Sequence, residues 1–382
     1  MDFALSDEQR MFSQMFADFV AKEIAPRAEE IDHDETLPPD MLRSAAEQGF
    51  LGAMLPEEYY GAELDHIGYT LLIEALAGAS MSVAVTLATH VSMVAMGILQ
   101  HGDDAQKERW LASMADGDTI GAFAFTEPDA GCDTAAVQTR AVFKDGDVLL
   151  DGVKVCVGNG HLAGVFLVFA RGPDGIDAFL VPRDTPGMSV GYREPTLGLR
   201  SSSFNTVYLE RCRIPLANRL GKPGEGESVA QQAWDRMALA LAAAGLGVAR
   251  SSIEVASQFA TERVQFGGPV AHKQAVQNMV AEAYIEVEAL RYLVFHTAWL
   301  ADQGVEYSVE ASVAKAFGSQ VARRATNRMV QVMGGYGYME DYPMARKYRD
   351  ARMLGIIGGP TELHHSRVAR HVFAERGLEV AP

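Results

Sequence analysis

VLLDGVKV (148–155), GVFLVFA (164–170) and DAFLVPR (177–183) are three short apolar runs that follow one another closely in this chain of 382 residues. Turn residues such as Asp145-Gly146 separate them from their neighbours. Runs rich in Val, Leu and Phe between turn residues predict strands, and this spacing predicts a compact antiparallel β domain over 119–223. Because the runs alternate little between apolar and polar residues, we expect flanking helices to cover both faces of the strands.

Both flanks of this region have helical periodicity. Before it, apolar residues recur at helical spacing, as at Met11, Met15 and Phe19, and Ser6 with Gln9 predicts a capping box. After it, helices are expected over 237–249, 251–262, 273–302 and 308–333, lengths that are typical of bundle helices. The expected fold class is therefore α+β with several domains: a helical domain at 1–118, the β domain at 119–223 and a helical bundle domain at 224–382.

The composition argues against several classes of protein. Acidic residues outnumber basic ones by 50 to 33, and the net charge of −17 argues against binding of nucleic acid or anionic lipid. The basic groups at 323–324 and 346–349 are expected to be ion-paired helix ends. Three cysteines without a Cys-x-x-Cys pair predict neither a disulfide framework nor a zinc site, which fits a reducing compartment. The N-terminal residues lack the pattern of a signal or transit peptide, so a cytoplasmic location is expected.

One segment, 75–102, has no Asp, Glu, Lys or Arg and is long enough to cross a bilayer. Its serine, threonine, histidine and glutamine side chains favour buried helices of a large helical domain, with the polar groups facing a pocket, over a membrane span. No stable membrane insertion is therefore expected.

Three glycine-containing segments are candidates for chemistry: FAFTEPDAGCD (123–133), GGYGY (334–338) and GGPTE (358–362). The first either holds a flat heterocycle or a phosphate through backbone N–H groups and a Thr hydroxyl, or is a tight loop between domains. The second does not fit a Rossmann or Walker loop, and a helix C-cap turn explains it. No Gly-x-Ser-x-Gly elbow supports a serine hydrolase, and the adjacent His364 and His365 do not predict a metal site.

Six segments, in their order along the chain, resemble those of the acyl-CoA dehydrogenase family of flavoproteins. They are TEPDAGCD at 126–133, VKVCVGN at 153–159, GLRSSSF at 198–204, ERVQFG at 262–267, AHKQAVQ at 271–277 and QVMGGYGYMEDYPMARKYRDAR at 331–352. The resemblance covers essentially the whole chain. It implies an N-terminal α-helical domain, a middle β-barrel-like domain and a C-terminal four-helix bundle, usually assembled as a homotetramer, a dimer of dimers.

FAD is the cofactor that the resemblance implies, bound between the β domain and the bundle. The positions that it implies near the isoalloxazine ring are Phe123, Phe125, Thr126, Cys132, Cys156 and Gly158. Those that it implies for the pyrophosphate and adenosine, reached across a subunit interface, are Arg263, Gln265, Phe266, Gln274, Gln331, Gly334 and Gly335, then Thr361 and Glu362. An arginine offers a forked cation to a diphosphate, and glycines let the backbone approach it. Cys132 and Arg236 are also expected to contact the substrate.

The implied reaction is the α,β-dehydrogenation of an acyl thioester, in which a carboxylate removes the α-proton and the β-hydrogen leaves as hydride to flavin N5. In IIGGPTE (356–362), however, Gly358 occupies the family's usual position for that base, and a glycine takes no proton. This departure leaves the identity of the base open.

Some subfamilies carry the base on the first bundle helix, immediately before an arginine, and Asp235-Arg236 is the nearest match. Alignment on Gly247 and Arg263 instead places Met237 there, and an offset of two residues turns a side chain by about 200° around a helix. Asp235 is the candidate base, against the alternative that it only complements the helix dipole. His90 is a weaker candidate, expected to be a pocket or core histidine.

Two departures concern the flavin. The family usually has an aromatic residue at position 156 and a hydroxyl at 158, where this chain has Cys156 and Gly158. Cys132 also replaces the usual serine near the thioester. An altered flavin environment and an atypical substrate are therefore expected, and for Cys156 a packing role is favoured over a redox role because no nearby positive charge would lower its pKa.

The resulting hypothesis is an FAD-dependent acyl-CoA dehydrogenase that acts on an acyl-CoA or an acyl-carrier thioester and passes electrons to an electron-transfer flavoprotein. Two alternatives stay open. One is a flavin-dependent oxidase or monooxygenase relative. The other is a subunit without a base that forms a hetero-oligomer with an active paralogue.

Overall fold

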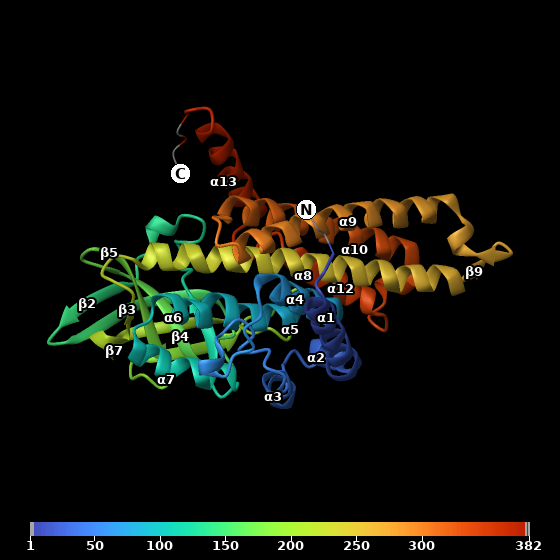
Figure 1. The fold of residues 1–382 in the computed structure, drawn as a ribbon. Coiled ribbons are helices and arrows are strands. Elements are labelled where there is room, and N and C mark those ends of the chain that lie inside the picture. The colour runs from blue at the N-terminus through green and yellow to red at the C-terminus, as the bar shows by residue number, and fades with distance from the viewer. Residues whose placement is uncertain (1–3, 379, 381–382) are drawn as a thin grey trace.

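The fold of the computed structural model has three parts in the predicted order, helical, β and helical (Figure 1). The structure describes residues 4–378 and 380. In the N-terminal part, the helices are α1 (Asp7–Phe19), α2 (Ala28–His33), α3 (Pro39–Glu47), α4 (His66–Ala79), α5 (Met81–Ala88), α6 (Met96–His101) and α7 (Asp104–Ala115), with a π-helical segment η4 (Thr89–Ala95) between α5 and α6. The predicted capping box is confirmed, since the Gln9 amide donates to Ser6 Oγ and the Ser6 amide donates to Gln9 Oε1.

The uncharged segment forms buried helices, as predicted. Met81–His101, which runs through α5, η4 and α6, is 94% buried over its most apolar window, and α8 (Gly226–Glu262) is 78% buried over its own. These are the two helices of the described chain that are long and apolar enough to cross a membrane. Their burial places them in the interior of the protein, where they pack on each other and on the sheet.

One eight-stranded sheet forms the middle of the chain. Its strands are β1 (Ile120–Ala124), β2 (Arg140–Lys144), β3 (Asp147–Gly158), β4 (Ala163–Gly172), β5 (Gly175–Pro182), β6 (Met188–Arg193), β7 (Phe204–Pro215) and β8 (Arg219–Leu220), in the order β6-β7-β3-β2-β4-β5-β8 with β1 beside β4. The antiparallel prediction is wrong for β1 and for the single β2–β4 bridge, which are parallel. The sequence of β1 does not show this, because β1 enters from the helical domain and not through a hairpin.

The two central strands are covered on both faces, as their unalternating sequences predict. Apart from their ends, β4 and β5 are buried along nearly their whole length. Phe166, Val168 and Phe179 belong to a core on one face of the sheet, while Leu167 and Phe169 join the larger core that includes the helices. This arrangement places the C-terminal end of β1 against the helical layer.

The C-terminal part contains three long helices, α8, α9 (Gln274–Asp302) and α10 (Ser308–Met333), with the shorter α11 (Gly335–Tyr338), α12 (Pro343–Met353) and α13 (Thr361–Ala374). The expected helices at 237–249 and 251–262 are one continuous helix, because Arg250 continues α8 without a break. Its small residues permit close packing: a Cβ on Gly247 would lie 2.1 Å from the Glu74 carbonyl oxygen of α4.

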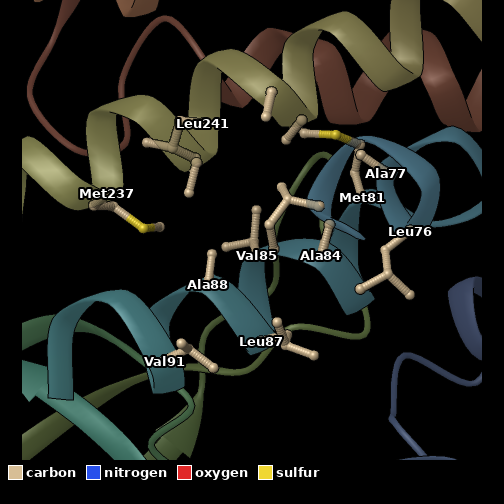
Figure 2. Close-up of a cluster of buried hydrophobic side chains, with 14 of the residues drawn as sticks. Leu76, Ala77, Met81, Ala84, Val85, Leu87, Ala88, Val91, Met237 and Leu241 are labelled. Carbon is tan, nitrogen blue, oxygen red and sulfur yellow. The ribbon is translucent and has the colours of Figure 1, made fainter. Parts of the chain in front are cut away.

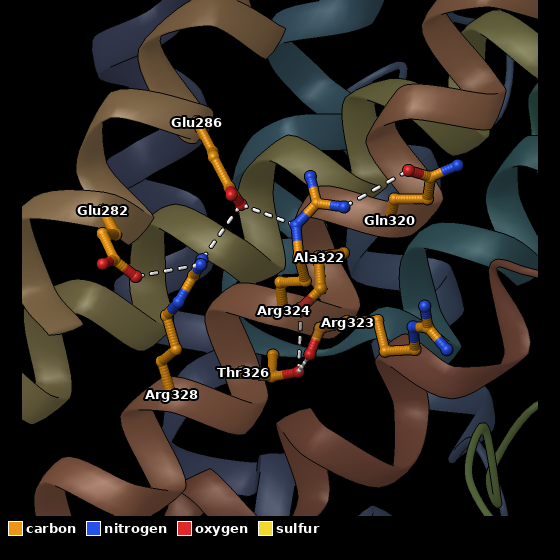
Figure 3. Close-up of polar contacts among 8 residues, drawn as sticks. All are labelled: Glu282, Glu286, Gln320, Ala322, Arg323, Arg324, Thr326 and Arg328. Carbon is orange, nitrogen blue, oxygen red and sulfur yellow. Dashed lines mark hydrogen bonds and ion pairs between the residues drawn. The ribbon is translucent and has the colours of Figure 1, made fainter.

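Ion pairs join α9 to α10 at several positions, which confirms Arg324 as an ion-paired residue. The helix-end part of the prediction is wrong, because residues 323–324 lie inside α10, and Arg323 forms no ion pair within the described part of the chain. Figure 3 shows Glu286 accepting from Arg324 Nε at 3.0 Å and from Arg328 at 3.1 Å, with Glu282 completing the network. In the second basic group, Arg349 pairs with Asp32. Lys347 differs from the expectation: it is buried and donates to the Gly78 carbonyl and to Ser251 Oγ, with no carboxylate within ion-pair distance in the described chain.

Candidate active site

The loop after β1 brings aromatic rings against the N-terminal half of α8. Phe123 and Phe125 stack with their centroids 6.5 Å apart, and the Phe125 ring lies 4.8 Å from that of Trp234 on α8. Phe169 of β4 packs against both phenylalanines. The β domain and the bundle therefore meet at the segment that the sequence singled out, in an apolar corner that suits a flat ring system.

Thr126 adds polar groups to this corner. Its carbonyl accepts a hydrogen bond from the Val155 amide at 2.8 Å, and its side chain is half-buried. Within residues 4–378 and 380, no hydrogen bond uses the Thr126 amide or hydroxyl as a donor. A partly buried threonine with unused donors beside an aromatic cluster fits the polar edge of a flavin.

Cys156 lies in a bulge of β3 and has a positive φ of 55°. It is exposed in this chain, because the bulge turns Cys156 outward and Lys154 inward, so it does not pack in the interior, and a packing role against the cofactor stays a prediction. Partial burial and the neighbouring Glu194 raise the pKa of the Cys156 thiol, which disfavours the reactive thiolate. Cys132 is also exposed, in the loop after β1, and a Cβ on Gly158 would make only ordinary contact with Thr89.

Most of the second predicted group lies at the opposite end of α8 from the first, while Thr361 and Glu362 follow the turn at Gly358 (Figure 1). Arg263, Gln265, Phe266 and Gln274 are exposed on and after a hairpin of β9 (Val264–Gln265) and β10 (Gly268–Pro269), and Phe266 is 94% exposed. The Arg263 guanidinium lies 5.2 Å from the Tyr336 ring centroid, which joins the hairpin to the segment with Gln331, Gly334 and Gly335. Open space surrounds both glycines.

Gly358 lies where the turn after α12 meets α8. It has a φ of +67°, and a Cβ on it would lie 2.6 Å from Leu241 Cδ1 and 3.9 Å from Met237 Cγ. Figure 2 shows Met237 and Leu241 facing the apolar side chains of α5, among them Val85 and Ala88. The family's usual base position therefore holds no acid, and Leu241 fills the space in which a side chain there would begin.

The backbone of this turn is fixed from the bundle side. His364 Nε2 donates to the Gly358 carbonyl at 3.0 Å, and Lys315 Nζ donates to the Gly359 carbonyl. Burial lowers the pKa of His364 to about 4 and that of Lys315 to about 7. Thr361 and Glu362 follow at the start of α13, and Glu362 is exposed. Of the two adjacent histidines, His364 is buried and His365 is exposed.

Asp235 is buried on α8, on a different face from Met237. Its carboxylate accepts from Ser308 Oγ at 2.6 Å and from Gln231 Nε2 at 2.7 Å, and Arg367 lies 3.9 Å away. Burial raises the pKa of Asp235, partly offset by these donors. The structure therefore does not bring Asp235 to the corner formed by Gly358, Met237 and Leu241.

Arg236 and His90 have interior partners. Arg236 donates from Nε to the Ser92 carbonyl at 2.7 Å and from Nη1 to Gln100 Oε1 at 2.5 Å. His90 is fully buried: its Nδ1 accepts from the Gly121 amide at 3.0 Å, and its Nε2 donates to the Met114 carbonyl. Full burial with both ring nitrogens bonded confirms the core histidine, and burial also lowers the pKa of His90 to about 4.

Sequence reasoning missed several buried polar residues around the site. Lys154 and Glu127 lie within the motifs at 153–159 and 126–133, and Lys315 lies outside every motif. One signal is present in the sequence: Lys154 occupies an inward position of a strand whose other buried positions are Val148, Leu150 and Val157. A lysine at such a position needs a buried partner.

Known proteins resemble this chain over its whole length. Three domain descriptions match in order: acyl-CoA dehydrogenase N-terminal domain at 6–118, middle domain at 122–212 and C-terminal domain at 224–373. An acyl-CoA dehydrogenase of Bacillus subtilis is 37% identical over 96% of this chain and 98% of its own. Butyryl-CoA dehydrogenase of Megasphaera elsdenii has a TM-score of 0.95 at 35% identity, covering 98% and 100% of the two chains.

Two further solved structures bear on the cofactor and the partner. A chain from the structure of the electron transferring flavoprotein of Acidaminococcus fermentans has a TM-score of 0.96 at 37% identity, covering 97% of this chain and 99% of that chain. Glutaryl-CoA dehydrogenase of Mycobacterium smegmatis, solved with FADH2, has a TM-score of 0.95 at 27% identity, covering 99% and 97%.

Fold and site together define a flavin-dependent oxidoreductase with an α-β-α domain order. The chain belongs to the acyl-CoA dehydrogenase family. This confirms the predicted family, the three-part fold, the enzyme class and FAD as the cofactor. The relatives favour the dehydrogenase over the oxidase or monooxygenase and over the subunit without a base.

Proposed function

We propose that this chain dehydrogenates a short-chain acyl-CoA thioester between its α and β carbons. One observation carries the proposal: Trp234, Met237 and Leu241 occupy one face of α8, at i, i+3 and i+7. Trp234 packs on the aromatic loop after β1, while Met237 and Leu241 face the apolar side chains of α5. A ring held by the loop and an acyl chain held by the apolar residues would then be neighbours along this helix. Relatives described as short-chain specific support the substrate class.

The cofactor site that we propose combines both predicted groups. Phe123, Phe125 and the unused donors of Thr126 would hold the ring, with Cys132, Cys156 and Gly158 around it. The exposed Arg263 and the open backbone at Gly334 and Gly335 would hold the diphosphate, with Gln265, Phe266, Gln274, Gln331, Thr361 and Glu362 near the adenosine. When bound, FAD accepts the β-hydrogen as hydride.

For proton removal we propose Asp235, which would take the α-proton as the thioester is oxidised to an enoyl thioester. Two observations support it: Asp235 is the one buried acidic residue of α8, and burial raises its pKa toward the range of an effective base. Cys132 and Arg236 would contact the substrate. Because Asp235 lies on a different face of α8 from Met237, its side chain would have to turn, and its hydrogen bonds from Ser308 and Gln231 would have to break, for it to reach the thioester.

We further propose a homotetramer that acts in the cytoplasm and passes electrons to an electron-transfer flavoprotein. The opposite positions of the two cofactor groups support an oligomer, because a second copy would bring them together (Figure 1). Exposed Tyr284, Ile285 and Trp299 on α9 supply an apolar surface for it. The structural relative from an electron transferring flavoprotein supports the electron acceptor.

We place the domain boundaries at 118/119 and 223/224, where helix gives way to strand and strand to helix.

The experiment is a substrate panel with the purified, FAD-loaded protein. Straight, branched and dicarboxylic acyl-CoA esters, and an acyl-carrier thioester, are each mixed with the enzyme with and without oxygen, and the visible flavin absorbance is followed. The proposal expects bleaching by a short straight acyl-CoA, with slow reoxidation in air. Rapid reoxidation by oxygen would favour the oxidase, and no bleaching by any member of the panel would refute the proposal.

A further inference from the structure

A buried lysine and a buried glutamate lie directly behind the loop that carries Phe125 and Thr126. The Lys154 side chain is fully buried, and Glu127 is 5% exposed. Lys154 Nζ lies 2.6 Å from Glu127 Oε1 and 3.0 Å from the Phe125 carbonyl oxygen, so one ammonium group binds both ends of the segment 125–127. Because a buried charge is costly without partners, this pair holds its geometry tightly.

The glutamate in turn connects the loop to the next part of the chain. Glu127 Oε2 accepts from the Gln138 amide at 2.6 Å, and Oε1 accepts from the Thr139 amide at 3.0 Å. Donation from two amides and an ammonium group lowers the pKa of Glu127 against the effect of burial, so it is ionised and acts as an acceptor at every position. The turn that follows is closed by Glu127 and Ala130, whose amides and carbonyls bond to each other.

These contacts use the carbonyl groups of the loop. The carbonyls of Phe125, Thr126 and Glu127 accept from Lys154, Val155 and Ala130 respectively. The Thr126 amide and hydroxyl are left without an acceptor within the part of the chain that the structure describes. The β3 bulge that separates Lys154 from Val157 directs Lys154 into the protein and leaves Cys156 exposed. A protein donor with no protein acceptor is available to a ligand.

We propose that Lys154, with Glu127, is a positioning residue of the flavin site: by binding the Phe125 carbonyl and the Glu127 carboxylate, it orients the donors of Thr126 toward the ring of the cofactor. The inference rests on the proposed cofactor site. Lys154 acts through Thr126 and contacts neither cofactor nor substrate. Its effect should therefore appear in the binding and spectrum of FAD more than in the fold.

The experiment compares Lys154→Met and Glu127→Gln with wild type and with Lys144→Met, an exposed lysine of the same domain. Each protein is stripped of FAD, and its circular dichroism and thermal unfolding are recorded. FAD is then titrated in, with the dissociation constant and the bound flavin spectrum as readouts. We expect Lys154→Met to raise the dissociation constant about tenfold or more and to alter the bound spectrum, with a smaller effect of Glu127→Gln and none of Lys144→Met.

Three results separate the possibilities. A folded Lys154→Met protein that binds FAD with wild-type affinity and spectrum would overturn the inference. A variant that is less stable without FAD but has a wild-type flavin spectrum once loaded would show a purely structural role, and would also overturn it. If Lys154→Met does not fold, Glu127→Gln decides by the same two readouts. A wild-type protein that binds no FAD would refute the proposed function itself.

Discussion

The surroundings of Gly358 predict that a side chain at this position, the family's usual base position, destabilises the protein. Two separate costs oppose a side chain there. The φ of +67° disfavours any residue with a Cβ, by about 1–2 kcal/mol. The Cβ would also lie 2.6 Å from Leu241 Cδ1, and overpacking of a core costs about 1–3 kcal/mol. Gly358→Ala is therefore expected to lower the free energy of unfolding by about 2–5 kcal/mol in total.

Gly304 provides a matched control, because its φ is +66° and a Cβ there meets nothing within 4 Å. Gly304→Ala should cost only the backbone part, about 1–2 kcal/mol. Urea unfolding measures the free energy of unfolding of both variants. The loss in Gly358→Ala minus the loss in Gly304→Ala gives the cost of the clash with Leu241. In a double-mutant cycle, Gly358→Ala made in the Leu241→Ala protein should cost only the backbone part, because the clash is then absent.

The same clash predicts the outcome of restoring the family's base. Gly358→Glu alone should give a destabilised protein with no gain in dehydrogenase activity, because the new side chain would have to displace the end of the buried Leu241 side chain. Equal stabilities of Gly358→Ala and Gly304→Ala, or a gain of activity in Gly358→Glu without a change at Leu241, would refute this account of the corner.

Three further predictions concern the base and the bundle. Asp235→Asn should lower kcat by about 10²- to 10⁴-fold with FAD content unchanged, and a loss below about threefold would exclude Asp235 as base. Burial lowers the pKa of Lys347 to about 7, so the folded state binds fewer protons than the unfolded state between pH 7 and 10.5 and stability rises with pH there. Lys347→Met should reduce this rise of the free energy of unfolding with pH, measured by urea unfolding, by at most about 1.4 kcal/mol per pH unit. An unchanged dependence on pH would contradict the lowered pKa of Lys347. Glu286→Ala, which removes the bonds to Arg324 and Arg328, should lower the free energy of unfolding by about 1–3 kcal/mol, against no change if these pairs are only surface contacts.

The sequence predicts the element types well where one local rule decides them. The capping box at Ser6 and the covered strands β4 and β5 follow from residue type and spacing alone. The parallel pairing of β1 with β4 does not, because pairing partners depend on the path of the whole chain. The continuity of α8 through Arg250 does not follow either, since a single charged residue on a helix surface resembles a boundary between two apolar runs.

Sequence motifs nominate the members of the candidate site but do not give the directions of their side chains. The motifs identify Phe125, Thr126 and Gly358, and the alignment places Met237 at the alternative base position; that Met237 lies near Gly358 comes from the structure. A β-bulge decides that Cys156 is exposed, and the spacing of a strand does not reveal a bulge. The partners of Asp235 come from α10 and α13, far away in sequence, so its orientation depended on tertiary packing.

The most direct measurement is a single anaerobic mixing of the FAD-loaded protein with an equal amount of butyryl-CoA. The account predicts that the yellow colour is lost and that a thioester lighter by two hydrogens appears in proportion to the flavin. A protein that stays colourless after reconstitution, or one whose yellow colour persists while the thioester is recovered intact, would contradict it.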